Sequence, residues 1–337
     1  MVYVGVDLHR KTAHVVALDQ GGTAILSRRV ATRPDELLRV FGELDHQPLE
    51  VAFEATFGWG WFADLLADAG IPAHMAHPLA TKAISSARVK NDSVDAKTLA
   101  HLLRTNLLPE AWIAPPEARE ARRLARMRTS LVRVRSQLRC QIHAVLAEHG
   151  VHADVSDVFG KAGRALLEDL ALPPVSKARL DANLRLIDAL TEEVAQAERE
   201  LLRALFRGDD RIKRLTAIPG VGLITAATVV TEVWDITRFP SADRLCSWAG
   251  LTPSEHSSGE HTRRGHISKQ GSRWLRWVLV EAAARPQADP DLRAFVDRIA
   301  SRRGTKIARV ALARRLLTLS FYALRDERRC RAFPVAR

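Results

Sequence analysis

The run Val2-Tyr-Val-Gly-Val-Asp7 decides the fold of the first third of the chain, because it is a strand pattern that ends on a carboxylate. Two further β-rich runs, 13–18 and 23–30, follow after short polar segments, and Gly21-Gly22 marks the second turn. Connections this short join antiparallel strands. The sequence therefore predicts a three-stranded antiparallel meander whose first strand ends at Asp7.

Helical and strand patterns alternate beyond the meander. We expect helices near 35–44, 58–69 and 92–103, and buried strands over 49–55 and 71–75. A meander followed by strands that alternate with helices is typical of a ribonuclease H-like α/β sheet. Pro115-Pro116 closes this region, so the first domain is expected to span 1–114.

Four carboxylates lie at the ends of these predicted elements: Asp7, Glu54, Asp92 and Asp95. The first two end runs that we expect to be neighbouring strands, and the other two are three residues apart on one helix face. Each has an ordinary explanation when taken singly, such as compensation of a helix dipole. Together they would repel one another unless they bound hard divalent cations. We therefore expect a site for Mg²⁺, with Mn²⁺ as a substitute, in which two ions hold both oxygens of an in-line phosphoryl displacement.

The segment 115–208 is helical and basic, with eight arginines between Arg119 and Arg139. Apolar residues recur every three or four positions in two long stripes, which predicts a coiled-coil connector. The stripes can pair within one chain or between subunits, and we favour an oligomerisation arm. The arginines either follow a phosphate backbone or form a solvated face. The stripes are Leu124, Met127, Leu131, Val134, Leu138, Ile142 and Val145, then Leu180, Leu184, Ile187, Leu190, Val194, Ala197, Leu201 and Leu205.

The last segment, 209–337, is expected to be mainly helical and contains Ile218-Pro-Gly-Val-Gly222. This run resembles the hairpin of helix-hairpin-helix modules. In such a hairpin, Gly220 and Gly222 would let backbone N–H groups approach a phosphate at the start of the next helix. A turn that merely packs two helices is the alternative. From 298 to 329 we expect one packed helix with a basic outer face.

Ser257 and Ser258 stand against Gly259 in what reads as a polar loop between helices at 238–250 and 272–284. A serine that attacks a phosphodiester needs a backbone able to approach the phosphorus, and positive charge where the transition state gains negative charge. An ordinary loop beside arginines that only bind nucleic acid is the alternative. The cations that follow are Arg263, Arg264, Lys269, Arg273 and Arg276.

Composition indicates a polyanionic partner. The 337 residues carry 51 Lys and Arg against 39 Asp and Glu, a formal net charge of +12, which favours nucleic acid. With 47% hydrophobic residues the chain can form its own cores. We expect no signal peptide, no membrane span and no disulfide framework, and hence a cytoplasmic protein.

Over nearly its full length the chain resembles the DEDD-type insertion-sequence transposases that are related to the pilin-gene invertases. The resemblance implies a RuvC-like N-terminal domain, a coiled-coil connector and a C-terminal transposase domain with an essential serine. It also implies recombination of an element's ends with a target, guided by a structured RNA from the element. The matching motifs are Val4-Gly-Val-Asp7, Glu54, Lys90-Asn-Asp-Ser-Val-Asp-Ala96, Ile218-Pro-Gly-Val-Gly222, Gly250-Leu-Thr-Pro253, Ser257-Ser-Gly259, Gly265-His-Ile-Ser-Lys-Gln-Gly271 and Leu275-Arg276.

The resemblance implies that the four carboxylates hold Mg²⁺ and that Ser258 is the nucleophile of a phosphoserine intermediate. Ser258 is preferred to Ser257 because it adjoins Gly259, and Arg263 or Lys269 would stabilise the developing charge. The expected partners are DNA, a guide RNA and further copies of the chain in a dimer or tetramer, with an active site that can be shared between subunits. Two alternatives remain. One is a metal-dependent nuclease or junction resolvase that uses only the carboxylates and water, and the other is a non-catalytic nucleic-acid-binding protein.

Overall fold

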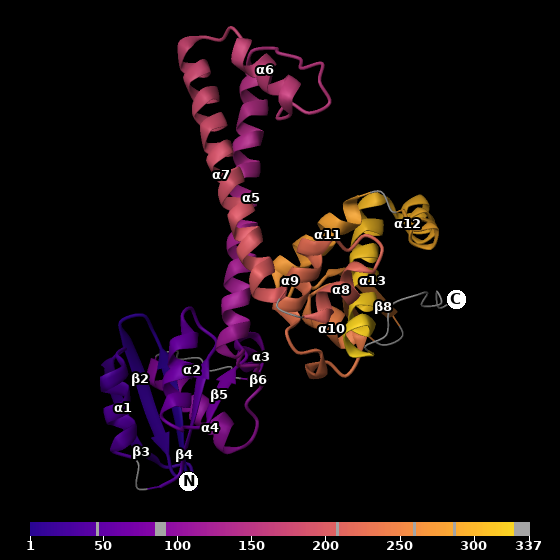
Figure 1. Cartoon of the computed structure of the whole chain (residues 1–337). Helices are drawn as coiled ribbons and strands as arrows, with labels where there is room; N and C mark the ends of the chain where they lie inside the picture. The colour runs from indigo at the N-terminus through magenta and orange to yellow at the C-terminus, as the bar shows by residue number, and fades with distance from the viewer. Residues whose placement is uncertain (45–46, 85–91, 207–208, 259–260, 286–287, 327–337) are drawn as a thin grey trace. The chain divides into compact units, whose positions relative to one another are not determined.

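The computed structural model describes residues 1–44, 47–84, 92–206, 209–258, 261–285 and 288–326. These residues form two compact units, Met1–Pro116 and Glu117–Arg337 (Figure 1). The first unit is a mixed α/β structure and the second is mainly helical.

A six-stranded mixed sheet forms the centre of the first unit, in the order β3-β2-β1-β4-β5-β6. Strands β1 (Val2–Leu8), β2 (Thr12–Leu18) and β3 (Ala24–Ala31) are antiparallel, which confirms the predicted meander. Strand β4 (Leu49–Glu54) runs parallel to β1, and β5 (Ala73–Ala76) runs parallel to β4. The short β6 (Glu110–Ala111) closes the edge. This arrangement is consistent with the expected ribonuclease H-like fold.

Four helices accompany the sheet: α1 (Pro34–Gly42), α2 (Trp59–Asp68), α3 (Pro78–Ile84) and α4 (Asp92–Arg104). The side chains of Val4, Val6, Leu37, Phe53 and Phe62 belong to one buried core of the sheet with α1 and α2. In this core the rings of Phe53 and Phe62 meet edge to face with centroids 5.2 Å apart.

Helix α4 lies unusually close to β1 because position 5 is glycine. A side chain there would place its first carbon 1.9 Å from the carbonyl oxygen of Ala96 on α4. Small residues on the helix, Ala96 and Ala100, pack against Val16 and Leu18 of β2 in a separate buried cluster. Gly5 therefore allows the carboxylate-bearing end of α4 to approach the sheet.

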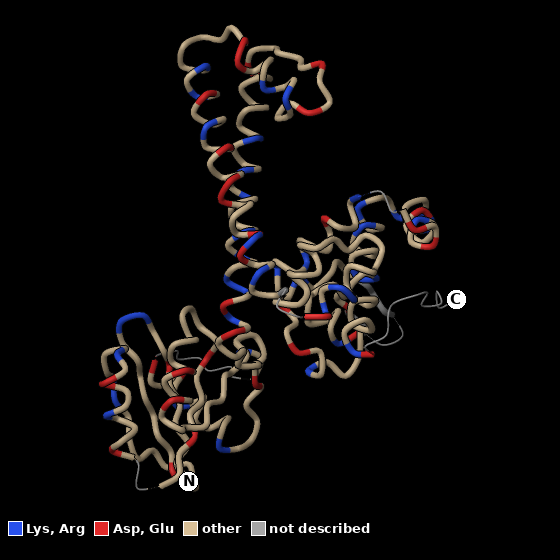
Figure 2. Tube along the Cα trace, in the orientation of Figure 1, with Lys and Arg blue, Asp and Glu red and all other residues tan. Residues whose placement is uncertain are grey.

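Two 33-residue helices, α5 (Pro116–Glu148) and α7 (Pro174–Phe206), run antiparallel in the second unit, and Lys and Arg recur along α5 (Figures 1 and 2). The guanidinium of Arg128 pairs with Glu198 at 2.6 Å, and Asn183 donates to Gln141 at 3.3 Å. The far end of the pair packs with α6 (Lys161–Asp169) through Leu167 and its neighbours.

The two predicted apolar stripes thus contact each other within one chain. Their pairing leaves Met127, Val134 and Leu186 at 44%, 44% and 53% exposure, respectively. Association of further copies through these helices stays a prediction.

The remaining helices share one core that includes Leu215, Val229, Leu279 and Phe321. They are α8 (Asp210–Thr216), α9 (Leu223–Val233), the short 3-10 helix η1 (Ile236–Arg238), α10 (Ala242–Trp248), α11 (Arg273–Ala284), α12 (Pro290–Arg303) and α13 (Thr305–Arg325). The single helix expected over 298–329 is wrong. Gly304, with φ of 84°, separates α12 from α13, because this backbone conformation suits glycine and ends a helix.

The stretch expected to be a polar loop also differs. Residues Pro253–Ser258 form β7 and His261–Ile267 form β8, which pair as an antiparallel ribbon with Pro253 opposite Ile267. Strands are recognised in sequence by alternating apolar residues. This ribbon is almost entirely polar, so its sequence carries no such signal.

Arginines of α5 hold the end of α9. The Glu232 carboxylate is 2% exposed and receives two hydrogen bonds from Arg126, from Nε at 2.8 Å and from Nη2 at 2.9 Å. Arg122 donates to the carbonyl oxygens of Thr231 at 2.9 Å and of Glu232 at 2.8 Å. These bonds fix the base of the long helix to the helical core.

Substitution Arg126→Ala is expected to destabilise the second unit, because it leaves the buried Glu232 carboxylate without its bidentate partner. Breaking a buried pair in this way costs about 3 kcal/mol, or about 6–12 °C in the unfolding midpoint of a unit this size. Scanning calorimetry measures the midpoint. Arg123→Ala on the same helix is the control, since the exposed Arg123–Glu120 pair contributes under about 1 kcal/mol. Equal midpoints for the two variants would contradict this account.

Candidate active site

The carboxyl ends of β1 and β4 meet at one edge of the sheet. The two strands pair in parallel with Val6 opposite Phe53, so Asp7 and Glu54 occupy successive positions at this edge. The expectation that these acids end neighbouring strands is confirmed. Helix α4 begins at Asp92, and its approach to β1 at Gly5 brings its first turn to the same place.

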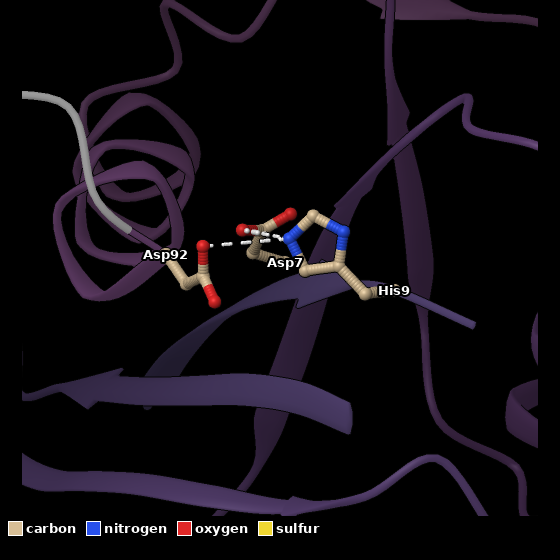
Figure 3. A group of neighbouring side chains, drawn as sticks. All are labelled: Asp7, His9 and Asp92. Atoms are coloured by element: carbon tan, nitrogen blue, oxygen red, sulfur yellow. Dashed lines mark hydrogen bonds and ion pairs between the residues drawn. The ribbon is translucent and has the colours of Figure 1, made fainter. Parts of the chain in front are cut away.

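Three side chains gather there: Asp7, His9 and Asp92 (Figure 3). Each offers one donor atom, and these atoms all lie within 4.8 Å of one another. The Nε2 atom of His9 lies 3.1 Å from Asp7 Oδ2 and 3.5 Å from Asp92 Oδ1, between the two carboxylates. The arrangement therefore joins the end of a strand, the turn after it and the start of a helix.

The pKa of Asp7 is raised above its ordinary value. The largest cause is burial, since only 7% of the residue is exposed, and the carboxylates of Asp92 and Asp95 raise the pKa further. Nearby His9 acts in the opposite direction, through its charge and its hydrogen bond. An ionised Asp7 is thus unfavourable in this place unless positive charge accompanies it.

The donor set fits a hard divalent cation. Carboxylate oxygens are the ligands that Mg²⁺ and Mn²⁺ prefer, and imidazole is a ligand of the transition metals. A cation would also offset the repulsion that raises the pKa of Asp7. The group can therefore hold a divalent metal ion with one buried and one half-buried carboxylate.

The other two predicted acids lie outside this three-residue group. Asp95 is close enough for its charge to raise the pKa of Asp7. The half-buried Glu54 ends the neighbouring strand. His9 was missed because only oxygen ligands were sought in the sequence. Its position two residues after Asp7 was the available signal, since residues i and i+2 of an extended chain point to the same side.

The predicted nucleophile lies in the second unit. Ser258 is the last residue of β7, opposite His261 of β8, and Ser257 is opposite Thr262. Arg263 and Arg264 lie in β8, opposite His256 and Glu255. The side chains of 256–264 and all of Gly259 lie outside the described residues.

The predicted hairpin joins α8 to α9. Gly220 in its turn has φ of 84°, and Gly222 is the residue immediately before α9. A side-chain carbon added at Gly222 would meet no atom within 4 Å, so the backbone there is open to an approaching group. Gly220 thus has a left-handed conformation that favours glycine, and Gly222 lies in open space. Phosphate binding at this hairpin stays a prediction.

The three remaining predicted cations differ in their contacts. Arg276 Nη1 donates to the carbonyl oxygens of Ala249 at 2.9 Å, of Gly271 at 3.1 Å and of Gln270 at 3.3 Å, which holds the turn before α11. Lys269 and Arg273 are exposed at that turn, and the Arg273 guanidinium lies 4.6 Å from the centre of the Trp274 ring. Binding of nucleic acid by these residues stays a prediction.

Among the described residues, no helix is both long and apolar enough to cross a membrane.

Comparison with known proteins gives matches to both units. Residues 4–150 match the model of the DEDD transposases of the IS110 type, and residues 212–297 match the model described as "Transposase IS116/IS110/IS902 family". A "Probable family 20 transposase" of Pseudomonas aeruginosa is 28% identical, covering 83% of this chain and 82% of the relative. The "Transposase for insertion sequence element IS1328" of Yersinia enterocolitica is 26% identical, covering 83% and 82%. A "Putative transposase y4pF/y4sB" of Sinorhizobium fredii is 27% identical, covering 95% and 83%.

A DEDD domain on a mixed sheet, with an acidic group at the strand ends, defines the class: an enzyme of DNA transposition that uses a divalent metal ion. The chain belongs to the IS110/IS116/IS902 family of transposases. It is accordingly an enzyme that acts on DNA, and the alternative of a non-catalytic binding protein is set aside.

Proposed function

We propose that the chain is the RNA-guided recombinase of its insertion sequence and that it exchanges DNA strands through a phosphoserine intermediate. The observation that carries this proposal is the grouping of Asp7, His9 and Asp92 at the edge of the sheet, in a chain that also matches the C-terminal transposase model. The first unit would serve as the RuvC-like domain, and the proposed boundaries are 1–114, 115–208 and 209–337.

Asp7 and Asp92 would hold Mg²⁺ or Mn²⁺, with Glu54 and Asp95 completing the set of acids. Bound there, the metal would neutralise negative charge on the phosphate oxygens. The buried Asp7 fixes one side of this site, and the Nε2 atom of His9 lies between the two carboxylates. The half-buried Asp92, whose side chain is 46% exposed, would leave the opposite side accessible to a DNA strand.

Ser258 would supply the nucleophile. Its Oγ would give up its proton and form a bond to the phosphorus while the scissile P–O bond breaks. The departing deoxyribose oxygen would take up a proton, so the net change moves one proton from the serine to the leaving group. The phosphoester bond is exchanged and not hydrolysed, so a second strand can later displace the serine without an outside source of energy. Arg263 or Lys269 would stabilise the charge of the phosphorane-like transition state.

A structured RNA transcribed from the element is the proposed guide, and a dimer or tetramer is the proposed assembly. The family resemblance, the net charge of +12 and the open backbone at Gly222 support binding of nucleic acid. The exposed apolar residues on α5 and α7 support assembly.

The test uses the full chain with end-labelled duplexes that carry the element's junctions, Mg²⁺, and RNA transcribed from the DNA flanking the gene. The expected result is labelled DNA that remains attached to protein after denaturation, only when both RNA and Mg²⁺ are present. Cleaved DNA without attached protein would favour a metal-dependent nuclease or junction resolvase. Equal product without RNA would contradict RNA guidance.

A further inference from the structure

An exposed aromatic ring lies at the same sheet edge as the carboxylates. Phe57 is three residues after Glu54, in the loop between β4 and α2, and is 104% exposed. Burying a phenylalanine ring is normally worth about 1.5–3 kcal/mol. Within the described part of the chain this ring has no ring or cation–π partner, so its surface is available to a ligand.

Hydrogen bonds hold the loop that carries Phe57 at Thr56, the residue before it. The amide of Thr56 donates to the carbonyl oxygen of Glu54 at 2.7 Å, and the Thr56 hydroxyl donates to that of Leu8 at 3.4 Å. Leu8 directly follows Asp7. On the other side, Gly58 has φ of 83° and leads into α2. The backbone thus fixes Phe57 beside the ends of β1 and β4.

Unpaired cations lie at the same edge. Arg10 and Lys11, in the turn between β1 and β2, are exposed and make no ion pair with any described residue. Cations that contact phosphates beside an aromatic ring that stacks on a base are the usual means of binding single-stranded nucleic acid. An apolar protein surface would instead have to desolvate these charges without replacing their hydration.

We propose that Phe57 stacks on an unpaired nucleobase next to the phosphate that a metal ion bound by Asp7 and Asp92 would hold, while Arg10 and Lys11 bind neighbouring phosphates. This inference rests on the proposed function in one respect, because it requires the acidic site to receive a DNA strand. In a duplex the faces of a base are covered by its neighbours, so the ring selects a locally melted strand. Phe57 is therefore a positioning residue for the scissile segment.

The first test measures binding of a fluorescein-labelled 15-nucleotide oligothymidine by the full chain, with Ca²⁺ in place of Mg²⁺. Phe57→Ala is expected to weaken binding about 5-fold to 100-fold, the usual effect of removing one stacking ring. Phe57→Trp is expected to keep the affinity of the unaltered chain. Leu107→Ala is the matched control. Leu107 is 63% exposed in the same unit, beyond the far end of α4 and about 20 Å from its start.

The second test needs no substitution. Oligothymidine that contains 5-iodouracil is irradiated in complex with the unaltered chain, and the adduct is located by mass spectrometry. Attachment at Phe57 is the expected result. Adducts found only elsewhere, together with unchanged affinity of Phe57→Ala, would overturn the inference. A Phe57→Ala chain that sediments as a smaller species and binds the oligonucleotide normally would do the same, because it would assign the ring to a protein contact.

Failure here can be distinguished from failure of the proposed function. If Phe57→Ala still forms RNA-dependent protein–DNA adducts at the unaltered rate and binds oligothymidine normally, the stacking role is wrong and the recombinase role stands. If the unaltered chain forms no RNA-dependent protein–DNA adduct but iodouracil crosslinks to Phe57, the stacking role stands and the recombinase role is wrong.

Discussion

Asp7→Asn is expected to reduce DNA strand cleavage by about 10²-fold to 10³-fold or more while leaving the chain folded. The buried carboxylate would supply the fixed negative charge that holds the cation, and loss of one preorganised electrostatic group commonly has an effect of this size. An amide has nearly the same shape but no charge, so packing around β1 is preserved. Rates of cleavage of a labelled junction duplex in Mg²⁺ give the measurement.

The same substitution is expected to stabilise the metal-free chain. Burial and the neighbouring carboxylates raise the pKa of Asp7, so the native state binds more protons than the unfolded state between the ordinary and the raised pKa. The Asp7 carboxyl therefore lowers the free energy of unfolding as pH rises through that interval, and the loss remains at neutral pH. In EDTA at pH 7, Asp7→Asn should unfold at the same or a higher temperature than the unaltered chain. Mn²⁺ should raise the midpoint of the unaltered chain but not that of Asp7→Asn.

The matched control is Asp68→Asn, an exposed carboxylate at the end of α2 in the same unit. It should leave cleavage, the metal-free midpoint and the Mn²⁺ response unchanged. Normal cleavage by Asp7→Asn would remove Asp7 from the catalytic site. A lower midpoint for this variant in EDTA would show that the carboxylate is stabilised by a contact other than metal.

Ser258→Ala is expected to abolish the covalent protein–DNA product, with a loss on the order of 10⁴-fold or more, as is usual when a nucleophile is removed. Ser257→Ala provides the comparison, because both residues lie at the end of β7 and pair with the same strand. The product is measured as labelled DNA that migrates with denatured protein. An adduct that persists in Ser258→Ala and is lost in Ser257→Ala would move the nucleophile by one residue.

The two substitutions separate the roles of the two units. Ser258→Ala should keep the rise in midpoint that Mn²⁺ produces, since the metal site lies in the first unit. Asp7→Asn should lose both that rise and the adduct. If instead Ser258→Ala cleaves DNA at the unaltered rate and the unaltered chain forms no adduct, water is the nucleophile and the nuclease alternative is correct.

The sequence predicted the sheet well because its strands carry strong local signals. The run Val2–Asp7 and the apolar segment before Glu54 each end on a carboxylate. Two antiparallel strands and helix α1 separate these runs in the chain, and the runs pair in parallel. The ribbon at 253–267 and the division at Gly304 were not predicted. The first lacks apolar alternation, and the second depends on a single backbone angle within an otherwise helical pattern.

The site was predicted only in part, because tertiary contacts decide which side chains meet. Asp7 and Asp92 come together as expected, but His9 joins them from a turn that has no motif of its own. Arg276 reads as a cation for nucleic acid, yet its guanidinium holds three backbone carbonyls. Phe57 attracted no notice in sequence because its exposure is a property of the folded loop.

The close contact between Gly5 and Ala96 makes the position of a carboxylate-bearing helix depend on a residue that has no side chain. Helix α4 can pack this close to β1 only because Gly5 has a hydrogen atom where every other residue has a side-chain carbon. A position with no functional group of its own therefore limits how closely the helix that begins at Asp92 approaches the strand that carries Asp7. Selection for recombination would act on that backbone spacing as strictly as on the acids themselves.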